Sequence, residues 1–112
     1  MSSDRAHARA ANPASVFAAL GDPTRLSLLT KLSDGQTRSI AWLSADTELT
    51  RQAITKHLRV LENAGLVSST RVGRESQFAF MPKPIVEVRA YLDSVSKQWD
   101  EALSRLRSFV ER

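Results

Sequence analysis

Residues 50–67 read TRQAITKHLRVLENAGLV, and this stretch decides the fold. Thr50 is suited to cap a helix because its hydroxyl can accept hydrogen bonds from the amides that follow, and Gly65 is suited to end it. Ile54 and Leu58 lie one turn apart and predict a buried face. Polar and basic side chains recur on the opposite face: Gln52, Thr55, Lys56, Arg59 and Asn63. We therefore expect an amphipathic helix, to about residue 64, that leaves a polar face free.

Two longer helices are predicted earlier in the chain. The apolar stripe within residues 16–20 indicates a first helix that closes at Gly21, where glycine can adopt the left-handed conformation. Asp22 and Pro23 then open a second helix, because the carboxylate can accept from free amides and proline suits the first helical position. This helix is expected to end at the turn of residues 33–35.

A short helical segment precedes the stretch quoted above. Ser39 opens it, and Ile40 and Leu43 share one of its faces. The polar residues 44–48 break the pattern, so we expect one or two helical turns followed by a turn. Together with the helix that starts at Thr50, this segment forms two helices joined by a turn.

A hairpin and a long helix follow. Residues 66–71 and 76–81 contain β-branched or aromatic side chains and flank the basic tip 72–75, which predicts two antiparallel strands. Pro84 suits the start of a last helix, about residues 84–110. Along it the apolar residues follow a seven-residue repeat, which is typical of a helix that pairs with another helix: Ile85, Val88, Leu92, Val95, Trp99, Ala102, Leu106 and Phe109.

The net charge of +4 is confined to one segment. Residues 1–50 hold five basic and five acidic side chains, and residues 75–112 hold six of each. The segment between them, residues 51–74, holds one acidic side chain, Glu62, and five basic ones: Arg51, Lys56, Arg59, Arg71 and Arg74. Such a local patch is expected of a surface that binds a polyanion, although an ordinary solvated basic face would look the same by charge alone.

Length and composition limit the organisation of the chain. Its 112 residues suit one domain, which we place at 13–112, after a tail of residues 1–12 that we expect to be disordered. The tail has no apolar run, which argues against a signal peptide, and no later stretch approaches the length of a membrane span. The absence of cysteine fits a reducing, cytoplasmic setting.

The order of helix, turn, helix and basic hairpin predicts a winged helix-turn-helix domain, mainly α with a small β-hairpin wing. A helix of this kind can enter the major groove of DNA, where Gln reads adenine, Arg or Lys reads guanine, and Thr reaches a phosphate or a thymine methyl. The side chains with the types and the spacing that this requires are Gln52, Thr55, Lys56 and Arg59. Arg71 and Arg74 could reach phosphates or a narrow minor groove. The helix by itself also fits an ordinary amphipathic surface helix.

Three stretches of the sequence resemble the ArsR family of bacterial winged-helix repressors. They are FAALGDPTRL at 17–26, the stretch 50–67, and RVGRE at 71–75, and the similarity covers roughly residues 14–110. The resemblance implies repression relieved by a signal, an inverted-repeat operator near a promoter, and a homodimer built from the first and last helices. That dimer contact would include Val16, Phe17, Leu92, Val95, Trp99, Leu106 and Phe109.

The same resemblance assigns residues to DNA. It places six in the recognition helix, Thr50, Arg51, Gln52, Thr55, Lys56 and His57, with Ser39 near the DNA backbone and Arg74 on the wing. The chain departs from the family pattern in the turn, where Glu48 replaces a frequent glycine.

Metal binding and catalysis are not expected. Many relatives bind metal through cysteines on the short helix or through Asp and His on the last one, but this chain has Trp42, no cysteine and no histidine at those places. Asp93 and Asp100 alone make a poor transition-metal site. His57 has no nucleophile beside it, so we expect it to pack internally or contact a phosphate.

The sequence therefore predicts a dimeric, sequence-specific DNA-binding regulator, most simply a bacterial repressor of transcription, without a cofactor and with an inducer that the residues do not identify. The alternative is a winged-helix module that binds a protein through the same surface. Against it, the surface is rich in Lys, Arg, Thr and Gln and has no aromatic residue before Phe78.

Overall fold

A computed structural model describes residues 12–111 of the chain. The elements follow in the order α2 (Pro13–Leu20), α3 (Pro23–Leu32), β1 (Arg38–Ser39), α4 (Ile40–Ser44), α5 (Arg51–Asn63), β2 (Val67–Val72), β3 (Glu75–Phe80) and α6 (Lys83–Val110). Of the tail predicted at 1–12, residues 1–11 lie outside the described part, and Asn12 caps α2 by accepting from the amide of Ala14 at 2.9 Å.

Side-chain caps start the next three helices. Oδ2 of Asp22 accepts from the Arg25 amide at 3.0 Å, as the sequence predicts for α3. Ser39 and Thr50 do the same for α4 and α5. The predicted end of α2 is wrong in one respect, because Gly21 has a φ of −79° and is not left-handed.

The core lies where α2, α3, α4, α5 and the start of α6 meet the sheet. Its members are apolar throughout: Val16, Ala19, Leu28, Leu29, Leu32, Leu43, Ile54, Leu58, Leu61, Leu66, Val67, Phe78 and Val88. The predicted buried face of α5 is therefore confirmed, since Ile54, Leu58 and Leu61 have no exposed surface. Burial of this face fixes which side of α5 remains outside.

The wing is a three-stranded antiparallel sheet in the order β1-β3-β2, and not a hairpin alone. The strands of the hairpin are shifted by one residue from the prediction, because Val72 pairs with Glu75 across a turn in which Gly73 has a φ of 62°. The third strand, β1, pairs Arg38 with Phe78. Two residues are too short to show the alternation that identifies a strand in a sequence.

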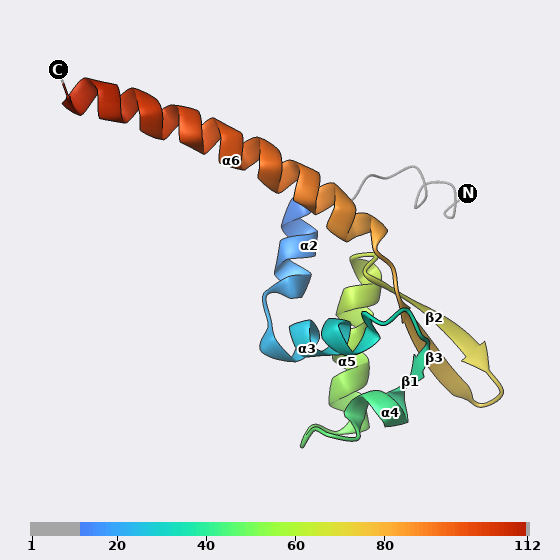
Figure 1. Cartoon of the computed structure of the whole chain (residues 1–112). Coiled ribbons are helices and arrows are strands. Elements are labelled where there is room, and N and C mark those ends of the chain that lie inside the picture. The colour runs from blue at the N-terminus through green and yellow to red at the C-terminus, as the bar shows by residue number, and fades with distance from the viewer. Residues whose placement is uncertain (1–11, 112) are drawn as a thin grey trace.

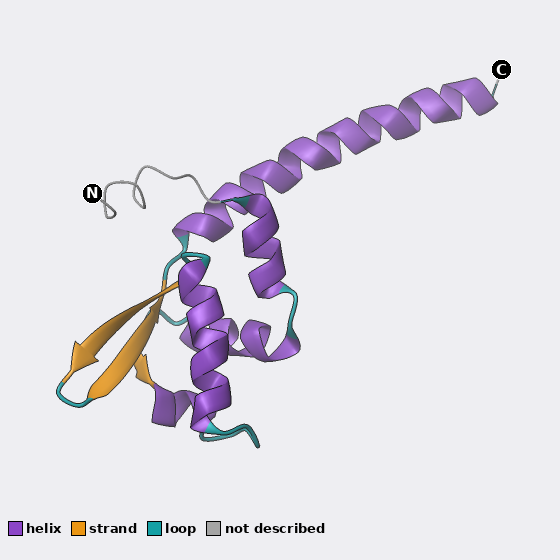
Figure 2. Cartoon of the chain, turned by 180° about the vertical axis from the view of Figure 1, so that it is seen from behind, coloured by secondary structure: helices purple, strands orange, loops and turns teal. Residues whose placement is uncertain are grey.

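Helix α6 leaves the rest of the domain. Its first turns cross α2, where the rings of Phe17 and Tyr91 lie 6.3 Å apart, and its remainder runs outward alone (Figure 1). Residues 96–111 are all exposed. Seen from behind, the hairpin and the free end of α6 lie on opposite sides of the body (Figure 2). None of the described helices combines the length and the apolar character needed to span a membrane.

Candidate nucleic-acid interface

A cleft of about 530 Å³ opens between the start of α4, the first turns of α5 and the tip of the hairpin. It is lined by Ser39, Ile40, Ala41, Arg51, Gln52, Thr55, Lys56, Arg74, Glu75 and Ser76. Six of these ten were predicted as DNA contacts: Ser39, Arg51, Gln52, Thr55, Lys56 and Arg74. The structure thus gathers residues of β1, α4, α5 and the hairpin, up to 37 positions apart in the sequence, around one opening.

Helix α5 is anchored so that its polar face forms one wall of the cleft. Thr50 caps it, with Oγ1 accepting from the Ala53 amide at 3.1 Å. Gln52 and Lys56 are exposed one turn apart, on the side opposite the buried Ile54. An exposed row of long polar side chains at this spacing is what a major groove can accommodate.

Thr55 lies between these residues and is half-buried. Its hydroxyl donates a hydrogen bond of 2.7 Å to the carbonyl oxygen of Arg51, one turn earlier in the same helix. The side chain is therefore tied back to α5 while it lines the cleft.

The five basic side chains of residues 51–74 are all exposed: Arg51, Lys56, Arg59, Arg71 and Arg74. None of them forms an ion pair with a residue of the described part of the chain. The acidic residue among them, Glu62, instead accepts a hydrogen bond of 2.7 Å from Ser69. The charge of the patch is thus available to an anion.

Not every predicted contact reaches the cleft. Arg59 lies further along α5, and Arg71 lies on β2 opposite Ser76, so both border the same surface without lining the opening. Thr50 acts as the cap of α5. Sequence reasoning missed Ile40, Ala41, Glu75 and Ser76, which flank predicted residues but carry no charge pattern or motif of their own, apart from Glu75 at the basic tip.

His57 points away from the cleft. Its Nδ1 lies 3.2 Å from Nη1 of Arg25 and 3.8 Å from Oδ2 of Asp22, both on the opposite side of α5. Of the two roles left open by the sequence, internal packing is the one that these contacts support. The pKa of Asp22 lies below its usual value, chiefly because the Arg25 amide donates to the carboxylate, with smaller contributions from the charges of His57 and Arg25.

The turn between α4 and α5 does not need glycine. No non-glycine residue of the described chain has a positive φ, so Glu48 fits the turn without backbone strain. Lys31 of α3 holds the turn by donating to the Leu43 carbonyl at 3.1 Å and by a short ion pair with Asp46. The hydrogen bond from Lys31 lowers the pKa of Asp46.

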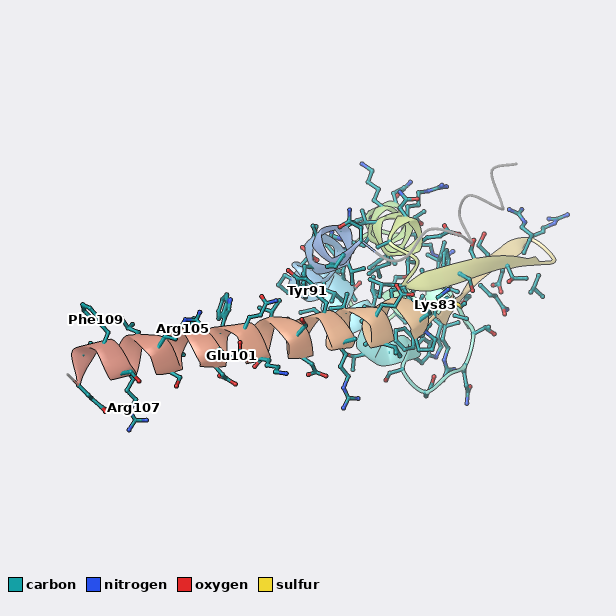
Figure 3. The ribbon with its side chains drawn as sticks, turned by 90° about the horizontal axis from the view of Figure 1, so that it is seen from above. Lys83, Tyr91, Glu101, Arg105, Arg107 and Phe109 are labelled. Atoms are coloured by element: carbon teal, nitrogen blue, oxygen red, sulfur yellow. The ribbon has the colours of Figure 1, made fainter. Side chains whose placement is uncertain are left out.

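A separate apolar row runs along α6. Leu92, Trp99, Leu106 and Phe109 are all exposed, Phe109 to 72%, whereas Val95 is half-buried. Phe109 points to the side on which α2 lies, and Arg107 points away from it (Figure 3). Phe17 adds an exposed edge from α2, but Val16 has no exposed surface and offers nothing to a partner.

The described residues contain no group of three or more His, Cys, Asp or Glu side chains that could hold a metal ion. Asp93 and Asp100 both lie on the exposed part of α6. The chemistry of the cleft is instead that of hydrogen bonding and positive charge.

Comparison with known proteins gives a consistent result. The model for the bacterial regulatory protein arsR family matches residues 22–69. The uncharacterized helix-turn-helix regulator YuzN of Bacillus subtilis (strain 168) is 41% identical over 80 residues, which cover 66% of this chain and 87% of that protein. The regulator Rv2034 of Mycobacterium tuberculosis is 27% identical over 100 residues, which cover 89% of this chain and 90% of the relative.

Solved structures agree with the sequence relatives. An ArsR-like transcriptional regulator from Rhodococcus sp. RHA1 has a TM-score of 0.73 and 37% identity, over 87% of this chain and 91% of that one. The predicted winged helix-turn-helix fold is thereby confirmed, with the additional strand β1 in the wing.

Proposed function

This chain belongs to the ArsR family of helix-turn-helix transcriptional regulators, and we propose that it acts as a homodimeric repressor on an inverted-repeat operator. Family membership makes it a DNA-binding regulator and not an enzyme. Beyond family membership, the proposal specifies which residues contact DNA, how two copies associate, and that binding silences a promoter.

The observation that carries the proposal is the cleft between α5 and the wing. It combines amide, hydroxyl, ammonium and guanidinium groups from Gln52, Thr55, Lys56 and Arg74. In the proposed complex, α5 enters the major groove, and Arg74 reaches a phosphate or the adjacent minor groove. Contacts to the DNA backbone would come from Ser39 and Arg51, which line the cleft, and from Arg59 and Arg71, which border it.

The dimer would form through α6 and α2. An exposed row of apolar side chains on a helix that extends beyond its own domain favours a partner, because a row of this kind loses contact with water on association. Two copies of this surface would place Leu92, Trp99, Leu106 and Phe109 against one another, with Phe17 at the edge.

A two-fold dimer presents two α5 helices to DNA. Recognition helices of such dimers contact half-sites about 34 Å apart, which is one turn of the duplex. A dimer bound to such an operator at a promoter would compete with RNA polymerase for the same DNA. This competition is the physical basis of the proposed repression.

The proposal is tested by titrating the purified protein against labelled DNA from upstream of its own gene and against an unrelated duplex, at two salt concentrations. Tight, salt-sensitive binding that prefers the upstream fragment supports sequence-specific regulation. Equal or absent binding to the two duplexes would contradict this proposal and favour the alternative, a winged-helix module that binds a protein through the same surface.

A further inference from the structure

The hydroxyl hydrogen of Thr55 is engaged inside α5 in this structure. Its Oγ1 donates to the carbonyl oxygen of Arg51 at 2.7 Å, inside the helix. A hydroxyl has one hydrogen to donate, so what remains for a ligand is the oxygen lone pairs and the methyl group. A phosphate oxygen only accepts hydrogen bonds, and Thr55 in this conformation is therefore a poor phosphate contact.

The surroundings of Thr55 favour its methyl group as the part that contacts DNA. Thr55 lines the same cleft as two aliphatic side chains at the start of α4, Ile40 and Ala41. The charged groups that suit phosphates belong to its neighbours Arg51 and Lys56. Among the base edges of the major groove, thymine is the one with an apolar group, the methyl at C5.

We propose that Thr55 is a specificity-determining residue that reads the C5 methyl group of one thymine in each half-site. This inference rests on the proposed binding of α5 in the major groove. It decides between the two partners, phosphate and thymine, that the sequence alone leaves open for a threonine on this helix.

The position of that thymine relative to other contacts follows from helix geometry. Gln52 and Thr55 are three residues apart, which is a rise of about 4.5 Å along α5. Successive bases of one strand are separated by about 3.4 Å. The thymine is therefore expected within about two base pairs of the pair that Gln52 reads.

The test begins with the duplex that the full-length protein enriches from a random-sequence pool. Each thymine is then replaced singly by deoxyuridine, which removes the methyl group and leaves base pairing intact. With the wild-type protein, we expect one replacement per half-site to weaken binding about fourfold, the effect of one buried methyl-sized group. This scan needs no protein variant.

Two variants assign the effect to Thr55. Thr55→Ser keeps the hydroxyl and removes the methyl from both copies in the dimer. It should therefore bind the thymine duplex about fourfold more weakly for each half-site, about sixteenfold for the dimer, and be indifferent to deoxyuridine at that position. Thr55→Val keeps a methyl and removes the hydroxyl, so it should retain the deoxyuridine penalty. Thermal unfolding of both variants checks that α5 is intact.

Three outcomes would overturn the inference. A scan with no sensitive thymine contradicts it while leaving the proposed function in place. A penalty of equal size in wild type and Thr55→Ser, or one that Thr55→Val abolishes, assigns the effect to another residue or to the hydroxyl. Failure to enrich any duplex would instead contradict the proposed function itself.

Discussion

Arg25 and His57 join α3 to α5, with Nη1 of Arg25 lying 3.2 Å from Nδ1 of His57. The same guanidinium donates through Nε to the Ala19 carbonyl at 2.6 Å and through Nη2 to the Ala18 carbonyl at 3.2 Å. One side chain thus connects α2, α3 and α5. These contacts tie α5 to α2, which belongs to the proposed dimer surface.

Replacing Arg25 tests this role. Arg25→Ala removes hydrogen bonds from a charged donor to two carbonyls at the end of α2, and we expect the free energy of unfolding to fall by about 2–3 kcal/mol. Urea unfolding at fixed protein concentration measures it. Arg89→Ala, at an exposed position of α6, is the control and should change stability by less than about 0.5 kcal/mol. Equal stability of the two variants would show that the connection contributes little.

Acid should weaken the turn that precedes α5. The hydrogen bond and charge of Lys31 hold the pKa of Asp46 below its usual 3.8, so the folded state favours the ionised carboxylate. Its stabilising effect is present above 3.8 and is lost as the pH falls through the lowered pKa. Asp46→Asn should therefore melt below the wild type near neutral pH, and the difference should shrink in acid.

Glu48→Gln provides the matched control for Asp46→Asn, because Glu48 is an exposed carboxylate in the same turn. Its melting temperature should follow that of the wild type across the same pH series. A difference between Asp46→Asn and wild type that stays constant into acid would mean that ionisation of Asp46 is not its cause.

Arg74 should act on every DNA sequence alike. Loss of one phosphate contact lowers the slope of log affinity against log salt by about 0.9 for each copy of the protein. Arg74→Ala is expected to lower the affinity for the operator duplex and for an unrelated duplex by similar factors. Salt titrations of binding to both duplexes measure this. Lys97→Ala, on the free part of α6, should leave the slope unchanged. A loss confined to the operator would mean that Arg74 reads bases.

Gln52 should act on sequence preference. Gln52→Ala removes an amide that can bond an adenine edge, so discrimination at one or two base pairs should fall by about 1–3 kcal/mol. Affinities for a set of single-base operator variants measure the change. Asn63→Ala, at the far end of the same helix and outside the cleft, should leave the preference intact. An unchanged preference in Gln52→Ala would mean that α5 docks differently.

The apolar row of α6 should control association. Leu106→Asp puts a charge into the proposed contact between two copies and should convert dimers to monomers in sedimentation experiments. Ser104→Asp places the same charge in the same turn but on the other side of the helix, and it should remain dimeric. Equal behaviour of the two variants would argue against this row as the dimer surface.

Local signals in the sequence predicted most of the fold. The cap at Thr50, the buried spacing of Ile54 and Leu58 and the stop at Gly65 together define α5, which the structure places at Arg51–Asn63. These features act within a few residues of one another, so they can be read without knowledge of the tertiary structure. The seven-residue repeat of α6 was found for the same reason.

What the sequence left open depends on contacts between distant residues. His57 has its partner 32 positions away at Arg25, and nothing near either residue indicates the pairing. Strand β1 exists because Arg38 meets Phe78 in β3, since two residues have no strand pattern of their own. The far wall of the cleft is likewise set by how α4 and the wing pack beside α5.

The measurement that tests the central claim most directly is a hydroxyl-radical footprint of the wild-type protein on its selected duplex. Two recognition helices on a two-fold dimer should protect two patches on one face of the DNA, with centres about 34 Å apart and related by the symmetry of the sequence. A single protected patch, or protection without sequence preference, would contradict the account of a dimer bound to an inverted repeat.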